Sequence, residues 1–584
     1  MYKNDQPDYT RIMIAVLLAA VVLTVWQAFY SIPHKQQLAA FYEEQAKVTA
    51  KKQTEYAKAL PTNATDSAEN PNLSRPERLA LSRRLKIQSD KLHGSIALKG
   101  AKFDDLTLAT YRETLDKSSP EVILFSPSGN DQAYLTQIGW VATDGKTRVP
   151  DAQSLWQADK PVLGVETPVT LNWNNGEGII YFMTITLDKN YMFNITQRVE
   201  NHSANEITVS PFAYINRAHV DLGKSKSAIL HDGPMGVIEA GLKEIPYKDV
   251  IEKGNQTFEN SNGWFGITDK YWLSAIVPSV PTFKTTYSYY QKNGIDRFQV
   301  DYMSAATAIA AGSEAKQDVR LFAGAKVVEI LDQYTKGETG GAPISLFDRA
   351  VDFGMLYFLT KPLFLLLNFF YGQVGNFGIA ILLLTFTVKL CLFPLANAGY
   401  KSSAQMRRVQ PHMAALKEKH ADDKMLFQKE LMALYKREKV NPASGCLPIL
   451  IQMPVFFALY KVLFVTIEMR HAPFFGWLKD LSAMDTSNIF TAFGLIPWTP
   501  PAFLHLGILP MLMCATMVIQ MRQQPTPADP VQAKVMKFMP FFFLFIFTSF
   551  PAGLVLYWIF SNTMSILQSA IITKKHGSAK HPKP

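Results

Sequence analysis

The longest apolar segments of this 584-residue sequence contain no aspartate or glutamate. Without acids inside them, these segments offer no buried ion pair and no carboxylate relay, which argues against a proton-coupled transporter. The sequence has only three cysteines, Cys391, Cys446 and Cys514, and none occurs in its middle portion. No C-x-x-C spacing is present, so we expect neither a disulfide framework nor a metal site. The phosphate-binding pattern G-x-x-x-x-G-K-[ST] is also absent, and we expect no ATP site and no cofactor.

Apolar runs near the N-terminus and after about residue 350 predict membrane spans, although several are shorter than the ~20 residues that a helix needs to cross a bilayer. The predicted spans are residues 12–30, 376–395, 447–467, 506–521, 538–550 and 553–572, six in all. The first could also be a signal peptide. Bulky residues stand where a small-x-small cleavage site would follow, so we favour an uncleaved anchor within residues 1–30 and leave cleavage open.

Between the first two spans the sequence resembles a water-soluble protein. Residues 31–85 are polar and predict a flexible linker. Residues 86–342 alternate with period two, which predicts strands. One strand has Tyr191, Phe193, Ile195 and Val199 on a single face, and others are expected at 179–187 and 282–290. Asn-Gly or Asp-Gly pairs at 144–145, 175–176, 262–263 and 293–294 favour tight hairpins, so we expect an antiparallel β-sandwich.

Basic residues gather on three segments that share one side in a six-span protein. Residues 396–446 carry ten Lys or Arg against five acids, residues 522–537 carry three against one, and the tail 573–584 adds four lysines. The positive-inside rule makes this side cytoplasmic. Both termini are then cytoplasmic, the sandwich lies outside, and residues 343–375 predict an amphipathic helix on the outer membrane surface, with a kink or a new helix at Pro362.

The basic segment 396–446 has helical spacing and predicts a helical hairpin. Its charge could serve only to set topology. Alternatively, the hairpin is a docking surface for the ribosome, a nascent chain or anionic lipid. The candidate docking residues are Arg407, Arg408, Lys417, Lys436 and Arg437.

Lys389 is the residue on which the functional interpretation depends. It lies about 14 residues into its span, which at ~1.5 Å per residue is ~20 Å deep. A charge near mid-membrane costs at least ~2.5–3.5 kcal/mol, and no acid in the predicted spans offsets it. Lys389 therefore either extends to the nearby cytoplasmic interface or faces a hydrated cavity. Lys461 lies nearer the outer end of its span, where the interface is easier to reach.

Other polar side chains occupy the same half of the predicted spans. Thr385 precedes Lys389 by one turn, and the remainder are Gln452, Gln520, Asn562, Ser565 and Gln568. The last three recur at spacings of three and form one stripe. Such a stripe can join helices by hydrogen bonds, or it can line a groove that is wet on the cytoplasmic side and closed outside.

Several motifs resemble the YidC/Oxa/Alb family of membrane-protein insertases, in particular its Gram-negative members with a large periplasmic domain. They occur in order and at fitting spacing over most of residues 345–575. The motifs are VGN at 374–376, TFTVK at 385–389, FPL at 393–395, MALYK at 432–436, KVNP at 439–442 with GC at 445–446, QMP at 452–454, FPAGLVLYW at 550–558 and SN at 561–562.

The resemblance implies a polytopic α-helical inner-membrane protein with a five-helix insertase core, a periplasmic super-sandwich domain and no enzymatic activity. The family's groove charge is most often Arg, and here Lys389 stands at that position. Thr385, Tyr557 and Trp558 match positions near the groove or the substrate path, and Gln452, Gln520, Asn562 and Ser565 would line the groove. Implied partners are nascent membrane proteins, the Sec translocon, the ribosome and the lipid bilayer, with no specific nucleic-acid sequence. We expect a functional monomer.

Two other classes of protein stay open. A channel or transporter would need a charge pathway through both leaflets, which the acid-free spans disfavour. A membrane-tethered enzyme would bind sugar on the sandwich and could use His219, Asp221, His231 and Asp232. We interpret these four as ordinary surface groups, because no convincing acid–base pair is apparent.

Overall fold

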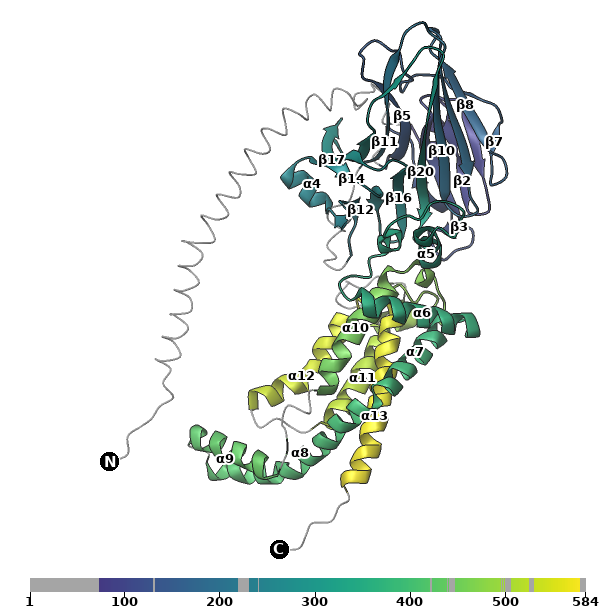
Figure 1. Cartoon of the computed structure of the whole chain (residues 1–584). Helices are drawn as coiled ribbons and strands as arrows, with labels where there is room; N and C mark the ends of the chain where they lie inside the picture. The colour runs from purple at the N-terminus through teal and green to yellow at the C-terminus, as the bar shows by residue number, and fades with distance from the viewer. Residues whose placement is uncertain are drawn as a thin grey trace.

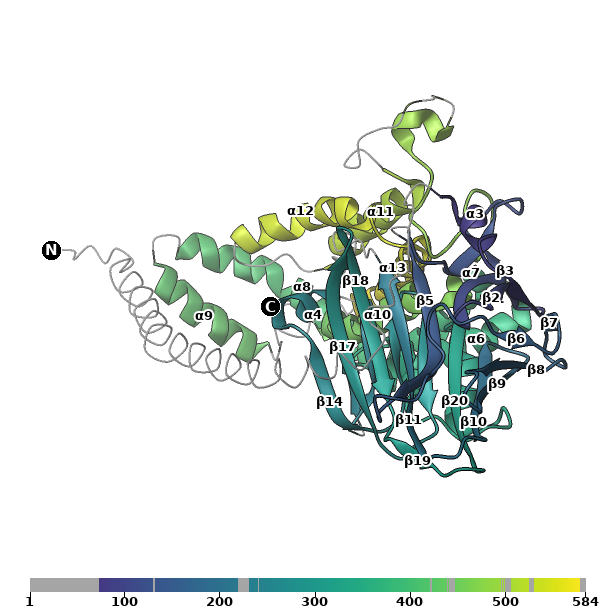
Figure 2. The ribbon, with the colours of Figure 1, turned by 90° about the horizontal axis from the view of Figure 1, so that it is seen from above.

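The computed structural model describes residues 73–129, 132–218, 230–239, 241–420, 423–438, 440, 447–494, 496, 498, 506–524 and 530–577. Its two parts are a β-domain and a bundle of helices below it in Figure 1. The predicted first span, most of the predicted linker, His219 and Asp221 lie outside the described residues. Seen from above, α8, α9 and α12 extend beyond the outline of the β-domain (Figure 2).

Two packed sheets make the β-domain, one of eleven strands and one of nine. The strands are β1 Arg84–Gln88, β2 Leu92–Ala97, β3 Lys102–Arg112, β4 Glu121–Phe125, β5 Tyr134–Ala142, β6 Gln157–Ala158, β7 Val162–Leu163, β8 Val169–Asn174, β9 Ile179–Leu187, β10 Met192–Asn201, β11 Ile207–Ala218, β12 Gly233–Ile238, β13 Gly241–Glu244, β14 Gln256–Ser261, β15 Phe265–Thr268, β16 Trp272–Pro278, β17 Phe283–Lys292, β18 Ile295–Met303, β19 Thr307–Ile309 and β20 Glu314–Ala325.

The larger sheet has the order β14-β17-β18-β11-β5-β3-β2-β1-β7, with β19 beside β11 and β4 beside β3. The smaller sheet has the order β13-β12-β15-β16-β20-β10-β9-β8-β6. Among the described strands, the pairing of β1 with β7 is parallel, and the other ladders are antiparallel. The predicted β-sandwich is therefore confirmed.

The core between the sheets follows from the alternation in the sequence. The predicted inward face of β10 is buried, with 0–1% exposure at Tyr191, Phe193, Ile195 and Val199. Gln197 lies on this same face, and its Nε2 donates to the Gly139 carbonyl of the opposite sheet at 2.8 Å, which satisfies a buried amide. The predicted turn at Asn293 and Gly294 joins β17 to β18 with φ of 54° and 74°, as a tight hairpin requires.

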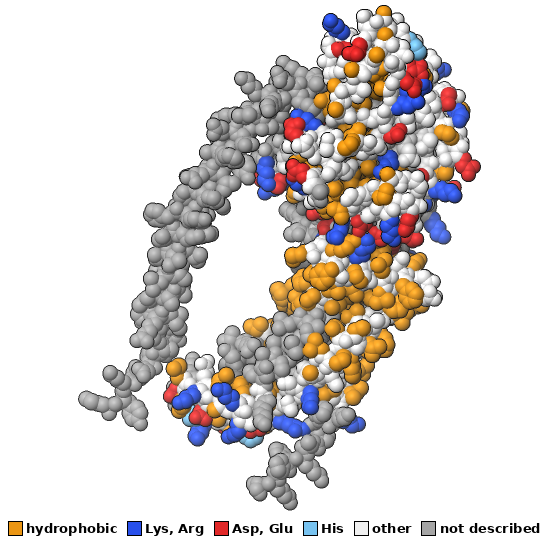
Figure 3. All heavy atoms as spheres, in the orientation of Figure 1, with side chains coloured by type: hydrophobic (Ala, Val, Ile, Leu, Met, Phe, Trp, Pro, Cys, Tyr) orange, Lys and Arg blue, Asp and Glu red, His pale blue; other side chains and the backbone are white. Residues whose placement is uncertain are grey.

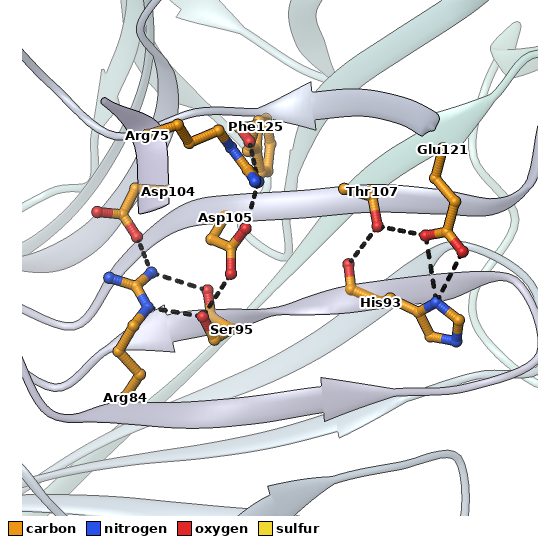
Figure 4. A network of polar contacts seen from close by, with 9 residues as sticks. All are labelled: Arg75, Arg84, His93, Ser95, Asp104, Asp105, Thr107, Glu121 and Phe125. Atoms are coloured by element: carbon orange, nitrogen blue, oxygen red, sulfur yellow. Dashed lines mark hydrogen bonds and ion pairs between the residues drawn. The ribbon is translucent and has the colours of Figure 1, made fainter. Parts of the chain in front are cut away.

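A polar network attaches the start of the described chain to the larger sheet (Figure 4). Helix α3 (Arg75–Leu79) places Arg75 against Asp105, and Arg84 of β1 pairs with Asp104. Ser95 Oγ donates to Asp105 Oδ2 at 2.5 Å. The predicted linker 31–85 therefore ends in ordered structure, because these ion pairs and β1 already involve its last residues.

The described helices of the bundle and its approaches follow the β-domain in the chain. They are α4 Tyr247–Lys253 within the domain, then α5 Val328–Lys336, η2 Phe347–Ala350, α6 Tyr357–Val374, α7 Phe377–Cys391, α8 Phe393–Lys419, α9 Lys424–Arg437, α10 Leu447–Val465, η4 Ile467–Met469, η5 Ile489–Gly494, α11 Ile508–Arg522, α12 Pro530–Phe547 and α13 Ala552–Gly577. Pro362 lies inside α6. Residues 530–537, which the sequence assigns to a loop, belong to α12 because the helix continues beyond its apolar part.

Length and composition do not confirm six membrane spans. Among the described residues, Ala552–Lys574 is long and apolar enough to cross a bilayer. Helices α7 and α8 would provide a second span if counted together, but they bend by 68°. Gln452–Val465 and Ile508–Arg522 are apolar and shorter. The apolar run 376–395 is thus not one helix: it divides at Leu392, just before Pro394 in the first turn of α8, where proline supplies no backbone donor.

Ion pairs and hydrogen bonds join the β-domain to the helical bundle. Lys461 Nζ of α10 lies 2.8 Å from Asp352 Oδ2. Lys361 Nζ of α6 contacts Asp332 Oδ1 of α5 at 2.7 Å and Asp348 Oδ2 of η2 at 2.9 Å. These contacts place the β-domain against the end of the bundle that contains α6 and η4.

His231 and Asp232 lie at this junction and are not the surface groups that the sequence suggests. The His231 backbone N–H donates to Asp352 Oδ2 at 3.2 Å, and its ring lies 3.0 Å from the Pro234 carbonyl. Burial lowers the pKa of His231 to about 4 and raises the pKa of Asp232 to about 6. His231 therefore contacts the segment that leads from the β-domain into the bundle, whereas the charges nearest Asp232 belong to the β-domain.

Candidate functional site around Lys389

Helix α7 determines where Lys389 lies. Its N-terminus is capped by Asn376, whose side chain accepts the N–H of Ile379 at 3.1 Å. The helix ends at Cys391, so Lys389 lies in its last turn. A cation there is favoured by the negative end of the helix dipole. The bend that follows turns the chain aside immediately beyond Lys389.

Neutral polar groups surround the Lys389 ammonium. Nζ donates to Gln452 Oε1 of α10 at 3.2 Å and to Ser565 Oγ of α13 at 2.9 Å. Within the described residues, no carboxylate lies within 4.0 Å of Nζ, as the acid-free sequence suggests. Three helices that are far apart in the sequence therefore converge on one positive charge. We call Lys389, Gln452, Ser565 and Tyr557 the lysine cluster.

Two tyrosine side chains contact the partners of Lys389 and hold them in place. Gln452 Nε2 donates to the Tyr557 hydroxyl, and Tyr557 is 1% exposed. Ser565 is 3% exposed and lies against the hydroxyl of Tyr400 in α8. Because the amide of Gln452 gives its N–H to Tyr557, its oxygen is the atom turned toward Lys389.

The polar stripe of α13 divides among three neighbours. Ser565 contacts Lys389, whereas Asn562 Nδ2 donates to Thr516 Oγ1 of α11 at 3.2 Å. Gln568 Nε2 lies 3.5 Å from the Phe393 carbonyl at the start of α8. The stripe therefore holds helices together and supplies a partner to Lys389. That it lines a wet groove stays a prediction.

The remaining predicted groove residues lie outside the lysine cluster. Thr385 is 1% exposed, and its hydroxyl donates to the Ile381 carbonyl of its own helix at 2.6 Å. Trp558 packs on the rings of Phe456, Phe543 and Phe547, with centroids 4.7, 6.4 and 5.0 Å away. Gln520 is half-buried near the end of α11.

The predicted docking residues lie at the end of the bundle opposite the β-domain. Figure 3 shows blue side chains concentrated there, beyond an orange apolar band. Arg408, Lys417, Lys436 and Arg437 are exposed, and Arg407 is half-buried. Helices α8 and α9 pack on each other through Met406, Val409, Met413, Leu434 and Val440. This small core holds the basic side chains on the outside of the pair.

The sequence did not reveal two residues that contact the polar stripe of α13. Tyr400 and Thr516 contact the α13 stripe from α8 and α11, but a tyrosine and a threonine in those helices carry no distinctive local signal. Asp352 was also missed as the partner of Lys461. Because Lys461 is a lone lysine in an otherwise apolar predicted span, it could have prompted a search for an acid nearby.

Comparisons with known proteins agree with this architecture. The model of the YidC periplasmic domain matches residues 84–366, and the model of the 60Kd inner membrane protein matches residues 369–579. The membrane protein insertase YidC of Rickettsia rickettsii (strain Sheila Smith) is 45% identical over 562 residues, covering 96% of this chain and 98% of the relative. The corresponding protein of Rickettsia prowazekii (strain Madrid E) is 46% identical over 567 residues, with the same coverage.

A crystal structure of an active YidC insertase with its first transmembrane domain resolved is 18% identical, with a TM-score of 0.35, and covers 86% of this chain and 96% of that chain. The two matching family models describe an inner-membrane protein with a periplasmic domain, which here is the β-domain above a bundle of helices with a polar site. This chain belongs to the YidC family of membrane protein insertases. Its relatives are insertases and not enzymes, which confirms the predicted class and disfavours both the transporter and the sugar-binding enzyme.

Proposed function

We propose that this protein inserts nascent inner-membrane proteins by drawing their polar segments toward the lysine cluster. The observation that carries the proposal is the partnering of Lys389 by two neutral side chains, Gln452 and Ser565, with no carboxylate among the described residues nearby. An ammonium has three N–H donors, and the described residues take two of them. The positive charge and one donor are then free for a substrate or for water.

The proposed topology has six spans, with both termini in the cytoplasm. The anchor in residues 1–30 would be the first span, and helices α7, α10, α11, α12 and α13 would supply the remaining five. The exposed basic residues of α8 and α9 lie opposite the β-domain, and the positive-inside rule then places them in the cytoplasm. Helix α6, which exposes Phe358 and Phe369, would lie along the periplasmic surface of the bilayer.

The mechanism we propose does not require ATP hydrolysis. A groove that is wet from the cytoplasm to Lys389 shortens the dry distance that a polar segment must cross. Lys389 attracts acidic substrate segments, and the membrane potential favours their outward movement by ~2.3 kcal/mol per charge at 100 mV. The apolar helix of the substrate then moves into lipid, and its burial there supplies the driving force.

Helices α8 and α9 would receive the substrate. Their exposed cations suit ribosomal RNA surfaces, an acidic nascent chain or anionic lipid headgroups, all of which attract basic patches. In this proposal the protein works as a monomer, alone or beside the Sec translocon, because the lysine cluster is built from one chain.

Depletion of the native protein and complementation with variants tests the proposal. We expect Lys389→Glu to abolish insertion of a small membrane protein with an acidic translocated segment, and Lys389→Arg to preserve it. Neutralising the acids of that substrate should reduce the damage done by Lys389→Glu. A deletion within residues 86–340 should have a smaller effect. Normal insertion by Lys389→Glu, together with failure of the deletion variant, would contradict the proposal and favour a function in the β-domain.

Cross-linking gives an independent measurement. A photoreactive amino acid at Ser565 should cross-link to the translocated segment of an arrested nascent chain. The matched control is Phe545 of α12, which is 57% exposed on the outside of the bundle. There we expect cross-links to lipid or to the apolar helix of the substrate, so equal cross-linking of the acidic segment at both positions would argue against a path through the lysine cluster.

A further inference from the structure

The connection between α10 and α11 exposes large apolar side chains. Phe475, Trp477, Phe490, Ile496 and Trp498 are 40–60% exposed. Single exposed apolar residues are ordinary on a protein surface, but a concentration of aromatic ones along one connection marks an interaction surface. We call the described residues from Phe490 to Trp498 the aromatic arm.

The part of this connection that follows Asp485 lacks charge. Residues 486–505 contain no aspartate, glutamate, lysine or arginine, whereas these residues make up 18% of the whole chain. A connection that faced water would ordinarily carry several of them. The absence of both signs of charge also leaves no means of pairing with an acidic or a basic partner, so the surroundings must be apolar or weakly polar.

The base of the arm is fixed at the end of the bundle that faces the β-domain. The backbone N–H groups of Ala552 and Gly553 donate to the carbonyls of Ala483 and Leu481 at 2.7 and 2.9 Å. Buried Asp485 accepts from Trp477 Nε1 at 3.1 Å and from the Leu509 N–H in the first turn of α11 at 2.9 Å. These bonds tie both ends of the connection to the bundle.

From this base the arm extends sideways. In the view from above, the yellow-green turn η5, flanked by grey trace, projects away from the helices and from the outline of the β-domain (Figure 2). A sideways projection from that end of a membrane bundle enters the headgroup region of the bilayer. Tryptophan suits this region because its ring is apolar and its N–H is polar.

We propose that the aromatic arm lies in the lipid leaflet on the β-domain side of the membrane and contacts the boundary between headgroups and acyl chains. The bundle itself has an apolar band on its surface in Figure 3, so a charge-free arm that projects sideways from the bundle has lipid as its occupant. Its contact beyond the rim of the helices would fix the depth and the rotation of the bundle in the bilayer.

Site-directed fluorescence on the full-length chain tests this position. In a background with Cys391→Ser, Cys446→Ser and Cys514→Ala, Phe490→Cys is labelled with an environment-sensitive fluorophore and reconstituted into phosphatidylethanolamine–phosphatidylglycerol vesicles. We expect a nitroxide near the headgroup of the lipid to quench the label more strongly than a nitroxide at the end of the acyl chain. Aqueous iodide should quench it several-fold less than the control label at Leu155→Cys, which is 56% exposed on the β-domain.

Each outcome decides the proposal. Equal iodide quenching at positions 490 and 155 would place the arm in water and overturn it. Protection from both iodide and lipid nitroxides, relieved by diluting the protein in lipid, would instead identify a second copy of the chain as the occupant. If Phe490→Cys does not fold, Trp498→Cys gives the same comparison. None of these results bears on insertion activity, so they are separate from the test of the proposed function.

Discussion

Two lysines within the helical bundle have opposite surroundings. Near the β-domain, Lys461 of α10 forms an ion pair with Asp352, with both side chains 16–17% exposed. Deeper in the bundle, Lys389 of α7 has only neutral partners among the described residues. Both lysines belong to apolar helices that contain no acid. Among the described residues, a carboxylate lies within 4.0 Å of Lys461 and none lies that close to Lys389, and the carboxylate comes from the segment before α6.

This difference separates a structural charge from an available one. A buried ion pair satisfies itself, and it fixes the geometry between two parts of a molecule because removing one partner is costly. A lysine with neutral partners keeps an unneutralised charge, which lowers stability and attracts an anion. Retention of that charge is understandable if a substrate uses it, which links the stability of the cluster to the proposed function.

The largest stability effect should come from removing the acid of the paired lysine. Asp352→Ala removes the carboxylate that lies 2.8 Å from Lys461 Nζ and also removes the acceptor of the His231 N–H. We expect the free energy of unfolding to fall by about 3 kcal/mol, measured by denaturant titration in detergent micelles.

A double variant is the control for this effect. Asp352→Leu combined with Lys461→Met replaces the pair by apolar groups and should recover most of the loss. If Asp352→Ala changed stability no more than an exposed substitution such as Leu155→Ser, Lys461 would not depend on its acid, and the comparison of the two lysines would fail.

Glu468 provides the opposite case, an acid that forms no ion pair with any described residue, and the pH dependence of stability tests it. Its Oε1 accepts the Val328 N–H at the start of α5 at 3.0 Å. Burial raises its pKa from 4.5 to about 7, assisted by the nearby charge of Glu329 and opposed by backbone hydrogen bonds including that from Val328. The charged form is therefore disfavoured in the folded protein.

The sign of the pH effect follows from proton binding. Between pH 4.5 and about 7 the folded protein holds a proton on Glu468 that the unfolded chain has lost. The free energy of unfolding should thus fall as the pH rises through this window, by about 3 kcal/mol in total. Glu468→Gln should remove this part of the pH dependence while retaining the Val328 bond. Identical pH profiles for the two proteins would show that the carboxyl is already charged and paired.

The fold class could be predicted because its signals are local. Alternation along β10 and β9 specifies which side chains face the other sheet, and Asn-Gly pairs specify turns such as that between β17 and β18. The six-span count is not confirmed, since α7 and α11 are only 15 residues long. The run 376–395 was predicted as one span, and it divides at Leu392; Pro394 is the sequence signal for such a break, but a proline alone does not show whether a helix kinks or ends.

The site was predicted less completely, for a different reason. An isolated lysine in an acid-free span is visible in the sequence, and so Lys389 could be singled out. Its partners Gln452 and Ser565 lie 63 and 176 positions away, and Asp352 lies 109 positions from Lys461. No periodicity shows which of several polar residues in different helices will meet. Trp558 and Gln520 were assigned to the groove with Lys389; the structure places neither in the lysine cluster, and their part in a groove stays a prediction.

The smallest effect, and the one that separates the two lysines most directly, is that of Lys389→Met on stability. Replacing an uncompensated ammonium by an apolar side chain of similar length should raise the free energy of unfolding by at most about 2 kcal/mol, because the half-exposed charge is partly hydrated. Gln452 retains its bond to Tyr557, and Ser565 can bond within its own helix. Insertion of an acidic substrate should fall in the same variant, so stability and activity change in opposite directions.

The matched substitution Lys461→Met should lower stability instead, because it removes the cation that pairs with Asp352. Denaturant titration of both variants beside an insertion assay makes the comparison, and a loss of stability in Lys389→Met as large as that in Lys461→Met would show that both charges are structural.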